Sequence, residues 1–415
     1  MRMMSVAAPA EILDRLRTRP DTARVLAALD GAGPDAYVVG GAVRDLLLGL
    51  EPLDLDVVVE GPLAPVLVAL GTPAREYGQF ETATVTVGAA RCDLARARAE
   101  TYSRPGALPD VSPAAIEQDL QRRDFTVNAI ALGVAGERAG ELLSVAGATR
   151  DLAEGRMRVL HDASFRDDPT RLLRLVRYAA RLGFEVEPHT RALVAEAVAA
   201  AAPTTVAGPR IGAELRLLAA EPDPIAALAG LTPLALDAAI ALGFGLDGPE
   251  PSASALTLLS DGGDRAALTL AVALQRVRER ERRSLLAELG FEAAMRDLIL
   301  ATARLGPGLV APLRCAESPS AIAGAVGSAP VEAVALAGAL GAHDAAARWI
   351  GELRSIALTI GGADLLAAGV PAGPAVGAAL RAALRAKLDG RTSGRESELA
   401  EALRAVRADG DRIDG

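Results

Sequence analysis

The feature that most constrains this chain is a glycine pair between two apolar segments, with two aspartates inside the second segment. Gly40 and Gly41 end one apolar run, and Asp54 and Asp56 lie two residues apart within the next. In a β-strand, residues two apart point to the same face, so the two carboxylates would project together while Leu55 packs on the other side. Glycine lets a chain turn sharply and lets its backbone approach a ligand. The pattern predicts a mixed α/β domain with paired carboxylates on one face of its sheet.

Two carboxylates side by side repel each other unless a cation neutralises them. Hard divalent cations such as Mg²⁺ prefer oxygen ligands and usually share them with substrate phosphates. The aspartate pair and the glycine turn therefore indicate a metal-dependent site that handles a nucleoside triphosphate. Asp93 is the best candidate for a third ligand, because it lies on a second predicted strand and adjacent strands are about 4.8 Å apart. The simpler alternative is that these aspartates are ordinary surface-facing residues of strands.

Hydrophobic periodicity divides the chain into a mixed first part and a helical remainder. The elements predicted for the first part are a helix over 10–31 divided at Pro20, strands over 36–39 and 53–59, helices from 43 and over 65–70, a hairpin over 82–87 and 91–98, a loop over 99–114, and regular structure again over 116–132. After residue 160 every predicted segment is helical: 169–182, 190–201, 209–219, 224–242, several Ala- and Leu-rich helices over 253–355, then 363–368, 374–389 and 394–407.

At 415 residues the chain is too long for one ordinary domain. Hydrophobic residues make up 51% of it, enough for sizeable cores, and alanine and leucine dominate its second half, which favours helix. We therefore expect an α+β fold in which a head with a mixed sheet and helices is followed by all-α regions. The expected boundaries are 1–150, 151–240, 241–356 and 357–415.

Several classes of protein are disfavoured by composition. No stretch gives a clean span of about 20 apolar residues, so we expect no membrane contact. The start of the chain lacks an apolar core of signal-peptide length, and Cys92 and Cys315 make no disulfide framework, which together favour the cytoplasm. The net charge of −9 is weak evidence against a nucleic-acid partner. Arginines nevertheless cluster over 156–191, and a local basic stripe can still bind phosphates.

A second polar cluster follows the predicted loop. Arg122 and Arg123 precede Asp124, and Asn128 lies four residues further on. Arginine forks bind phosphate oxygens bidentately, so the cluster suits contacts with a triphosphate and a ribose. The alternative is the N-terminus of a helix, capped by Asp124, with both arginines in solvent.

A third cluster begins at Asp168, which fits the N-cap of a helix whose first position is a proline. Arg171, Arg174, Arg177 and Arg181 then recur every three or four residues, which places them on one helical face. Like charges at that spacing repel, so a nearly pure arginine face favours an anionic partner. The alternative is a solvated charged face, the usual meaning of a charge run.

Asp168 and Arg171 together could select a nucleobase. A carboxylate accepts hydrogen bonds, and a guanidinium donates them. Cytosine and adenine offer an amino donor beside a ring-nitrogen acceptor, whereas uracil and guanine present a carbonyl and an N–H at those places. An aspartate and an arginine one turn apart are therefore a physical template for C and A against U and G.

Taken in this order, the motifs resemble those of class II tRNA nucleotidyltransferases, the CCA-adding enzymes, and of bacterial poly(A) polymerases in the same superfamily. The resemblance covers about residues 37–182, and a weaker similarity covers 358–390. It implies a polymerase-β-like nucleotidyltransferase head followed by three helical regions. These are a head over 1–150, a neck that selects bases and binds RNA over 151–240, a body over 241–356 and a tail over 357–415.

The resemblance also implies roles for single residues. Asp54 and Asp56 match the metal-binding pair, and Gly41 and Arg44, beside Gly40, match the nucleotide-contacting residues of the first motif. The remaining matches are Arg122, Arg123, Asp124 and Asn128 in the ribose and phosphate motif, and Asp168, Arg171, Arg174 and Arg177 in the base-templating helix. The family usually has Glu-Asp where this chain has Asp167-Asp168, a change that leaves the base-facing Asp168 intact.

The activity implied by the resemblance is template-independent, Mg²⁺-dependent addition of C, C and A to the 3′ end of tRNA. CTP and ATP would be the substrates, pyrophosphate the product, and the helical regions would hold the tRNA acceptor arm. A flexible loop at 99–114 helps the family switch from C to A, and its full length here favours complete CCA addition. The alternatives are a CC-adding or A-adding partial enzyme, a poly(A) polymerase and, as a different class, a non-catalytic RNA-binding protein.

Overall fold

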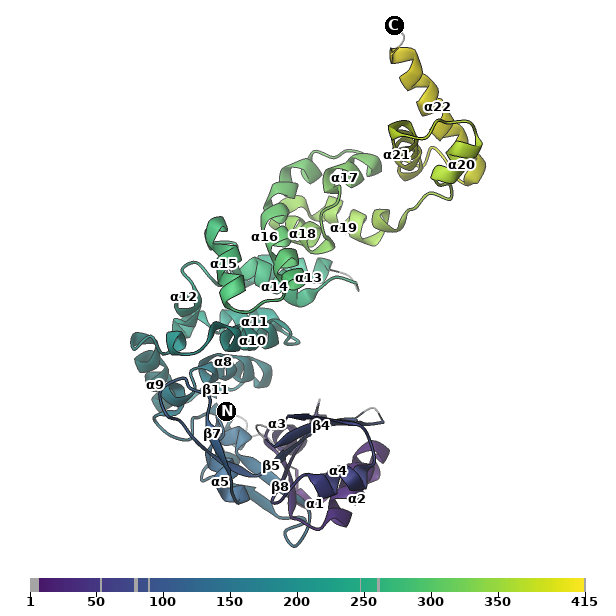
Figure 1. The fold of residues 1–415 in the computed structure, drawn as a ribbon. Helices are drawn as coiled ribbons and strands as arrows, with labels where there is room; N and C mark the ends of the chain where they lie inside the picture. Colours follow the sequence, from purple (N-terminus) through teal and green to yellow (C-terminus); the bar gives the residue numbers. More distant parts are fainter. Residues whose placement is uncertain are drawn as a thin grey trace. The chain divides into compact units, whose positions relative to one another are not determined.

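A computed structural model describes residues 7–52, 54–77, 81–88, 90–246, 248–259 and 262–413 (Figure 1). The chain divides into two compact units, and each is described by itself. The first unit comprises Met1–Asp223 with Gly230–Ile240, and the second comprises Pro224–Ala229 with Ala241–Gly415.

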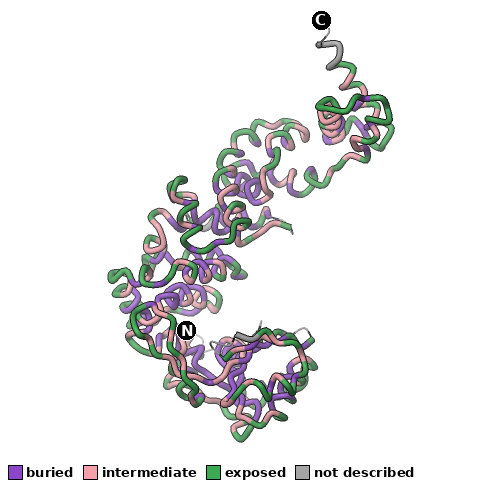
Figure 2. The backbone as a smooth tube through the Cα atoms, viewed as in Figure 1, coloured by how far each residue is buried: buried purple, intermediate pink, exposed green. Residues whose placement is uncertain are grey.

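A seven-stranded mixed sheet forms the centre of the first unit, in the order β3-β4-β5-β2-β1-β8-β9. β2 and β5 pair in parallel, and the other neighbours pair antiparallel. The central strands β1 and β8 are buried along their whole length (Figure 2), as their runs of Val, Ile, Leu and Ala require. The strands are β1 Ala36–Val39, β2 Leu55–Val59, β3 Ala74–Tyr77, β4 Thr82–Val87, β5 Ala90–Arg96, β8 Ile130–Ala135 and β9 Leu142–Ser144.

Helices cover both faces of this sheet. On one face α2 contacts α4, β4 and β8, and α3 contacts β1 and β2. On the other face α5 packs Ile116 and Leu120 against Tyr37, Val39 and Val58. These helices are α1 Pro9–Thr18, α2 Pro20–Ala32, α3 Gly40–Leu47, α4 Ala64–Leu70 and α5 Ile116–Gln121.

Most elements predicted for the head are confirmed, including the break at Pro20 and the hairpin of β4 and β5. The strand predicted from residue 53 begins instead at Leu55; residue 53 itself lies outside the described residues, and Asp54 precedes the strand. The helix expected from residue 43 already begins at Gly40.

The prediction of a loop over 99–114 is wrong at both ends. β6 Arg98–Thr101 and β7 Asp110–Pro113 pair antiparallel, so only 102–109 connects them. Both strands are short and polar and lack the alternating apolar residues that announce a strand in sequence. Pro113 closes β7, where a missing N–H interrupts no ladder.

A helical layer completes the first unit, and within it α8 contacts α10. The prediction that everything after residue 160 is helical misses β11, which pairs with β10 in parallel. The helix expected over 224–242 is broken by Gly230 and Pro233 into three pieces. The elements are α6 Ala148–Glu154, β10 Arg156–Met157, α7 Ser164–Asp167, α8 Thr170–Leu182, β11 Glu185–Val186, α9 Pro188–Ala199, α10 Gly208–Ala219, α11 Pro224–Ala229 (in the second unit), a 3₁₀ turn Thr232–Leu234 and α12 Leu236–Ile240.

The second unit is helical throughout its described residues, as predicted. One core joins α13, α14 and α16 to α19 around Leu268, Leu336 and Ile350, and another cluster around Leu365 and Ala383 joins α20 to α22. The helices are α13 Pro249–Leu258, α14 Arg265–Ala273, α15 Glu279–Glu288, α16 Ala293–Arg314, α17 Pro319–Val326, α18 Val331–Ala337, a π-turn Gly338–Ala342, α19 His343–Gly351, α20 Gly362–Ala367, α21 Pro374–Leu388 and α22 Arg395–Ile413.

Among the described residues, no single helix combines the length and the apolar composition needed to cross a membrane. By length and composition alone, Pro319–Val326 taken together with Val331–Ser355 passes the same test, but the two segments meet at a bend of 113°.

Candidate active site

The glycine turn brings two charged side chains to the end of β1. Gly40 has φ +65°, a left-handed conformation that favours glycine, and it opens α3 directly after β1. A Cβ at this position would lie 2.8 Å from Nη1 of Arg123 and 4.0 Å from Oδ2 of Asp56. Gly40 therefore makes room for Arg123 beside Asp56, as expected for a glycine that allows a close approach.

The acidic residues Asp54, Asp56 and Asp93, here called the acidic edge, meet where β2 and β5 pair. Asp56 lies directly opposite Asp93 in the parallel register, so the two side chains share a face, while Leu55 and Val57 are buried on the other. Asp54 is exposed and precedes β2, so the prediction that it shares a strand with Asp56 is wrong.

Asp56 is a carboxylate without a partner in the described part of the chain, where no side chain donates to it or forms an ion pair with it. Burial is the main reason that its pKa rises to about 6; the charge of Arg123 opposes this rise, and Asp93 and Asp54 add to it. Asp93, by contrast, accepts a hydrogen bond from Oγ1 of Thr84 at 2.5 Å.

The acidic edge can hold a hard cation, but not as a closed cage. The described residues bring no three His, Cys, Asp or Glu side chains together as a ready metal site. Asp56 is nevertheless a desolvated, unpaired oxygen donor, and the charges of two other aspartates act on it. Mg²⁺ commonly takes one or two protein carboxylates and fills its remaining positions with water and substrate phosphates, so the donor set fits that ion.

Arg122 and Arg123 follow α5 directly, and Arg122 is the residue at its C-terminal cap. The buried Asp119 on α5 accepts from both, at 2.7 Å from Nη2 of Arg122 and 2.8 Å from Nη2 of Arg123. Arg122 also donates to Glu100 on β6 at 2.8 Å. The Nε of Arg123 is buried without a partner in this structure. The pair is therefore held in place, and the predicted alternative of two arginines in solvent is wrong.

Asp124 and Asn128 form a buried network that includes Arg44. Asn128 donates to Asp124 at 3.0 Å and accepts from Nη1 of Arg44 at 2.6 Å. Burial alone would raise the pKa of Asp124, but the charge of Arg174 and the hydrogen bonds from Asn128 and Arg174 outweigh it and lower the pKa to about 2. Arg44 is 1% exposed and also pairs with Asp45. It supports Asn128 here, and its contact with a nucleotide stays a prediction.

The four arginines of α8 (Arg171, Arg174, Arg177 and Arg181), here called the arginine face, are not the uncompensated row that their spacing indicated. Arg174 pairs with Asp124 at 2.7 Å and with Glu214 on α10 at 3.5 Å. Glu221 lies 3.4 Å from Arg177 and 2.7 Å from Arg181. Repulsion along the helix therefore gives no argument for an anionic partner, because carboxylates 40 or more residues away in sequence pair with Arg174, Arg177 and Arg181. The anionic partner itself stays a prediction.

Asp168 and Arg171 are held separately at the start of α8. Oδ1 of Asp168 accepts from the backbone N–H of Thr170 at 3.1 Å, as a capping side chain does. The buried Arg171 donates to Oγ of Ser164 and to the carbonyl oxygen of Arg122, each at 2.8 Å. Arg210, on α10, donates to Asp168 at 3.0 Å.

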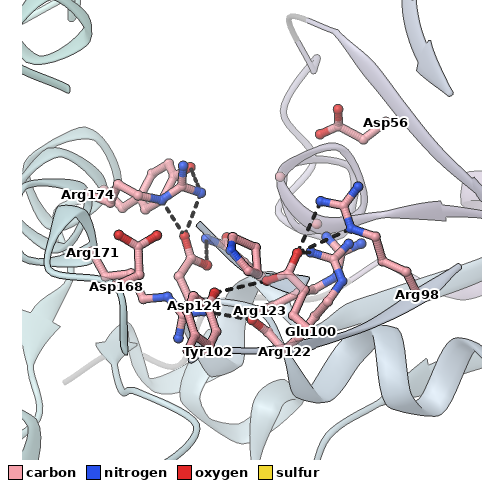
Figure 3. Close-up of a pocket in the computed structure, with 15 residues that line it drawn as sticks. Asp56, Arg98, Glu100, Tyr102, Arg122, Arg123, Asp124, Asp168, Arg171 and Arg174 are labelled. Carbon is pink, nitrogen blue, oxygen red and sulfur yellow. Dashed lines mark hydrogen bonds and ion pairs between the residues drawn. The ribbon is translucent and has the colours of Figure 1, made fainter. Parts of the chain in front are cut away.

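One pocket of about 340 Å³ joins these clusters. Figure 3 shows Asp56 on one side, Asp168, Arg171 and Arg174 on another, and Arg122, Arg123 and Glu100 between them. The predicted site residues that line it are Gly40, Gly41, Asp56, Arg122, Arg123, Asp124, Asn128, Asp168, Arg171 and Arg174. Asp93 lines a neighbouring pocket with Asp56, Arg122 and Arg123, while Asp54, Arg44 and Arg177 line neither.

The sequence interpretation missed the pocket residues from the hairpin of β6 and β7. Arg98, Glu100, Tyr102 and Pro109 line the pocket, as does Tyr178 on α8. The prediction of one loop over 99–114 gives no indication of which side chains face inward. A period-two analysis of residues 98–102 is the signal that could have found them, since Arg98, Glu100 and Tyr102 alternate along one face.

Comparison with known proteins reveals the relatives of this site. The family described as the Poly A polymerase head domain matches residues 36–158. The CC-adding tRNA nucleotidyltransferase of Deinococcus radiodurans is 46% identical over 200 residues, covering 46% of this chain and 52% of its own. The A-adding tRNA nucleotidyltransferase of Halalkalibacterium halodurans is 39% identical over 233 residues, 54% of each chain. These matches support a class II tRNA nucleotidyltransferase and poly(A) polymerase family as the relatives of this chain.

Similarity to solved CCA-adding enzymes extends beyond the head. The Thermotoga maritima CCA-adding enzyme, solved in complex with tRNA, matches with a TM-score of 0.75 and 27% identity over 98% of this chain and 100% of that one. The predicted fold, a mixed-sheet head followed by helical regions, is confirmed. By sequence, the chain matches only about half the length of the two relatives above.

Proposed function

We propose that this chain adds nucleotides to the 3′ end of tRNA without a nucleic-acid template, using CTP and ATP and releasing pyrophosphate. The observation that carries the proposal is the single pocket that joins Asp56 to Asp168 and Arg171. A reacting phosphate could lie beside the acidic edge while its own base lies against α8. A protein that only bound RNA would have no need for this combination.

The acidic edge is the proposed centre of the reaction. Asp54 and Asp56, with Asp93, would bind Mg²⁺, which when bound supplies activation of the tRNA 3′-hydroxyl and stabilisation of the leaving pyrophosphate. Asp56 lines the pocket and has no competing partner among the described residues, so its carboxylate is available for this task.

The triphosphate would lie along Arg122 and Arg123. Asp119 and Glu100 hold these arginines from behind, so their guanidinium groups need little reorganisation when an anion binds. The unpartnered Nε of Arg123 is a donor that a phosphate oxygen could satisfy. Asp124 and Asn128 line the same wall and would face the ribose.

Asp168 and Arg171 would choose the base. Asp168 would accept from the amino group of cytosine or adenine, and Arg171 would donate to the neighbouring ring nitrogen. Uracil and guanine would instead place a carbonyl acceptor against Asp168 and an N–H donor against Arg171. A site whose buried polar groups are left unpaired in this way rejects such bases strongly.

Complete CCA addition is our first candidate for the product. The hairpin of β6 and β7 contributes Tyr102 and Pro109 to the pocket, so the segment associated with switching from C to A in the family is in contact with the site. The likeness to solved CCA-adding enzymes over nearly the whole chain supports the same candidate. Partial addition is the second candidate, since the two relatives named above are a CC-adding and an A-adding enzyme.

Three tRNA transcripts test the proposal: one that ends before the CCA sequence, one that ends after C and one that ends after CC. Each is incubated with CTP, ATP, UTP or GTP, singly and together, with Mg²⁺ or with excess EDTA, and the products are sequenced. Complete CCA addition predicts that all three are extended to CCA and that addition then stops.

Other outcomes separate the alternatives. A CC-adding enzyme would stop after CC, an A-adding enzyme would extend only the transcript that ends in CC, and a poly(A) polymerase would add long A tails to unselected RNA. No Mg²⁺-dependent extension of any transcript would refute the proposal and leave a non-catalytic RNA-binding protein. The Asp54→Asn/Asp56→Asn double variant is the matched inactive control.

A further inference from the structure

A contact between three distant segments lies behind the base-reading end of the pocket. Arg210 on α10 donates from Nη1 to the carbonyl oxygen of Gly106 and from Nη2 to Oδ1 of Asp168, each at 3.0 Å. Gly106 lies in the connection between β6 and β7, 62 residues before Asp168 in the chain. One guanidinium thus holds the hairpin connection and the base-reading carboxylate at the same time.

The two oxygens of Asp168 are used differently. Oδ1 accepts from Nη2 of Arg210 and from both the backbone N–H and Oγ1 of Thr170, at 3.1 and 2.7 Å. Among the described residues, Oδ2 has no hydrogen-bond donor. Three donors on one oxygen fix the carboxylate, and because Asp168 lines the pocket, the other oxygen is the one left for a ligand.

The hairpin connection is fixed where Arg210 contacts it. Gly106 is buried, has φ +69° and donates from its backbone N–H to the carbonyl oxygen of Asp167 at 3.3 Å. A Cβ on Gly106 would lie 2.7 Å from the backbone oxygen of Thr205, which precedes α10. Any larger residue at 106 would therefore push the connection away from Arg210 and Asp168.

We propose that Arg210 is a positioning residue for base selection: it locks Oδ1 of Asp168 so that Oδ2 faces the base amino group, and Gly106 lets the hairpin connection support it. This inference rests on the proposed function, since it concerns which base that site accepts. Without Arg210, the remaining donors to Asp168 both belong to Thr170, two residues away, and the carboxylate can turn. Arg171 is held by Ser164 and Arg122 instead, so its contact with the ring nitrogen should survive.

A pair of nucleotides isolates the amino contact. ATP and purine riboside triphosphate share the ring nitrogen that Arg171 would read, but only ATP has the amino group that Asp168 would read. The ratio of their kcat/KM values for addition to a tRNA ending in CC therefore reports Asp168 alone. A preference for ATP is expected from the wild-type chain, and Arg210→Gln should lower this ratio about 10-fold, as the loss of one well-placed hydrogen bond does.

Three further variants serve as an intermediate case, an independent test and a control. Arg210→Lys retains the charge but not the fork, so its ratio should fall between those of the wild type and Arg210→Gln. Gly106→Ala should lower the ratio in the same direction without touching Asp168. Arg191→Gln removes an exposed arginine from α9 and should leave the ratio unchanged. Thermal unfolding of each variant separates a loss of selectivity from a loss of folding, and Gly106→Ala carries the test if Arg210→Gln does not fold.

The outcomes separate the inference from the function on which it rests. A wild-type chain that adds neither nucleotide overturns addition of A by this chain, and with it the inference as stated for the adenine amino group. A wild-type chain that adds both equally overturns the proposed base selection and the role of Arg210 with it. A wild-type chain that prefers ATP, together with folded Arg210→Gln and Gly106→Ala variants that prefer it equally, overturns the role of Arg210 alone. A fall in kcat for both nucleotides with an unchanged ratio would show a merely structural role and would also contradict the inference.

Discussion

The acidic edge and the arginine face are both rows of like charges, and the protein treats them in opposite ways. On α8, Asp124, Glu214 and Glu221 come from other segments and neutralise Arg174, Arg177 and Arg181. On the acidic edge, Asp56 has no partner among the described residues and its pKa rises to about 6, mainly through burial. Carboxylates from the same chain therefore neutralise the arginine face, whereas Asp56 on the acidic edge is left unpaired by the described residues and is proposed to bind a metal ion.

The difference shows how to interpret a charge row. Spacing along the sequence places like charges together, but only the partners from remote segments tell whether the row builds the protein or binds something else. A buried pair stabilises little over an apolar contact, yet losing one member is costly. A carboxylate left alone in a pocket is destabilising unless a cation joins it. The two rows should therefore respond oppositely to neutralising substitutions.

Asp56→Asn should have the largest effect, and on activity rather than on stability. The variant loses a proposed metal ligand, so we expect the single-turnover rate of extension of a tRNA ending in CC to fall at least about 1,000-fold. The free energy of unfolding, measured in urea at pH 7, should stay the same or rise, because a desolvated charge is removed. A clear loss of stability would show that Asp56 is a structural residue, and the acidic edge would then stabilise the fold just as the arginine face does.

Glu221→Gln should have the opposite effect to Asp56→Asn, because it should lower stability rather than activity. Glu221 is 4% exposed and pairs with both Arg177 and Arg181, so the variant leaves Arg181 without this carboxylate and Arg177 with Glu214 alone. We expect the free energy of unfolding in urea to fall by about 3 kcal/mol.

Glu196→Gln is the matched control for Glu221→Gln. It neutralises an exposed glutamate on α9 and should change the free energy of unfolding by less than about 0.5 kcal/mol. Equal effects of the two substitutions would mean that the arginine face does not depend on its carboxylates.

Much of the head could be predicted from the sequence, because its strands carry strong local signals. The buried β1, the hairpin of β4 and β5 and the break at Pro20 follow from apolar runs and from proline. The choice of Asp93 as a third ligand already places β5 next to β2, but the parallel register of the two strands could not be predicted, since it is set by topology rather than by local pattern. It is nevertheless this register that places Asp93 opposite Asp56.

The partners of the predicted site residues were the part that sequence could not supply. Asp119 holds Arg122 and Arg123 at helical spacing and was within reach of a local argument. Glu214, Glu221 and Arg210 were not, because they meet α8 only when α10 packs against it. The sequence motifs identified the residues of the site, but the packing of α10 against α8 decided which of their charged side chains are paired within the protein.

The third prediction concerns the pH dependence of the Asp124–Arg174 pair. The pKa of Asp124 is lowered to about 2 in the folded chain, so its contribution is complete above about pH 4 and is lost as the pH falls towards 2. The shift corresponds to about 2 kcal/mol. The difference in free energy of unfolding between wild type and Asp124→Asn should shrink by that amount between pH 5 and pH 2 in urea titrations. A difference that stays constant over this range would contradict the assignment.

Arg91→Gln should have the smallest effect, and it tests where the acidic edge ends. Arg91 lies 3.4 Å from Asp93, but its side chain is 57% exposed, and exposed pairs contribute little. Asp93 keeps its hydrogen bond from Thr84 in this variant. We expect a change of less than about 0.5 kcal/mol in the free energy of unfolding and little change in the rate of extension. A large loss of activity with unchanged stability would mean that Arg91 contacts the substrate. Arg91 would then belong with the charged side chains that bind a ligand rather than with those that stabilise the fold.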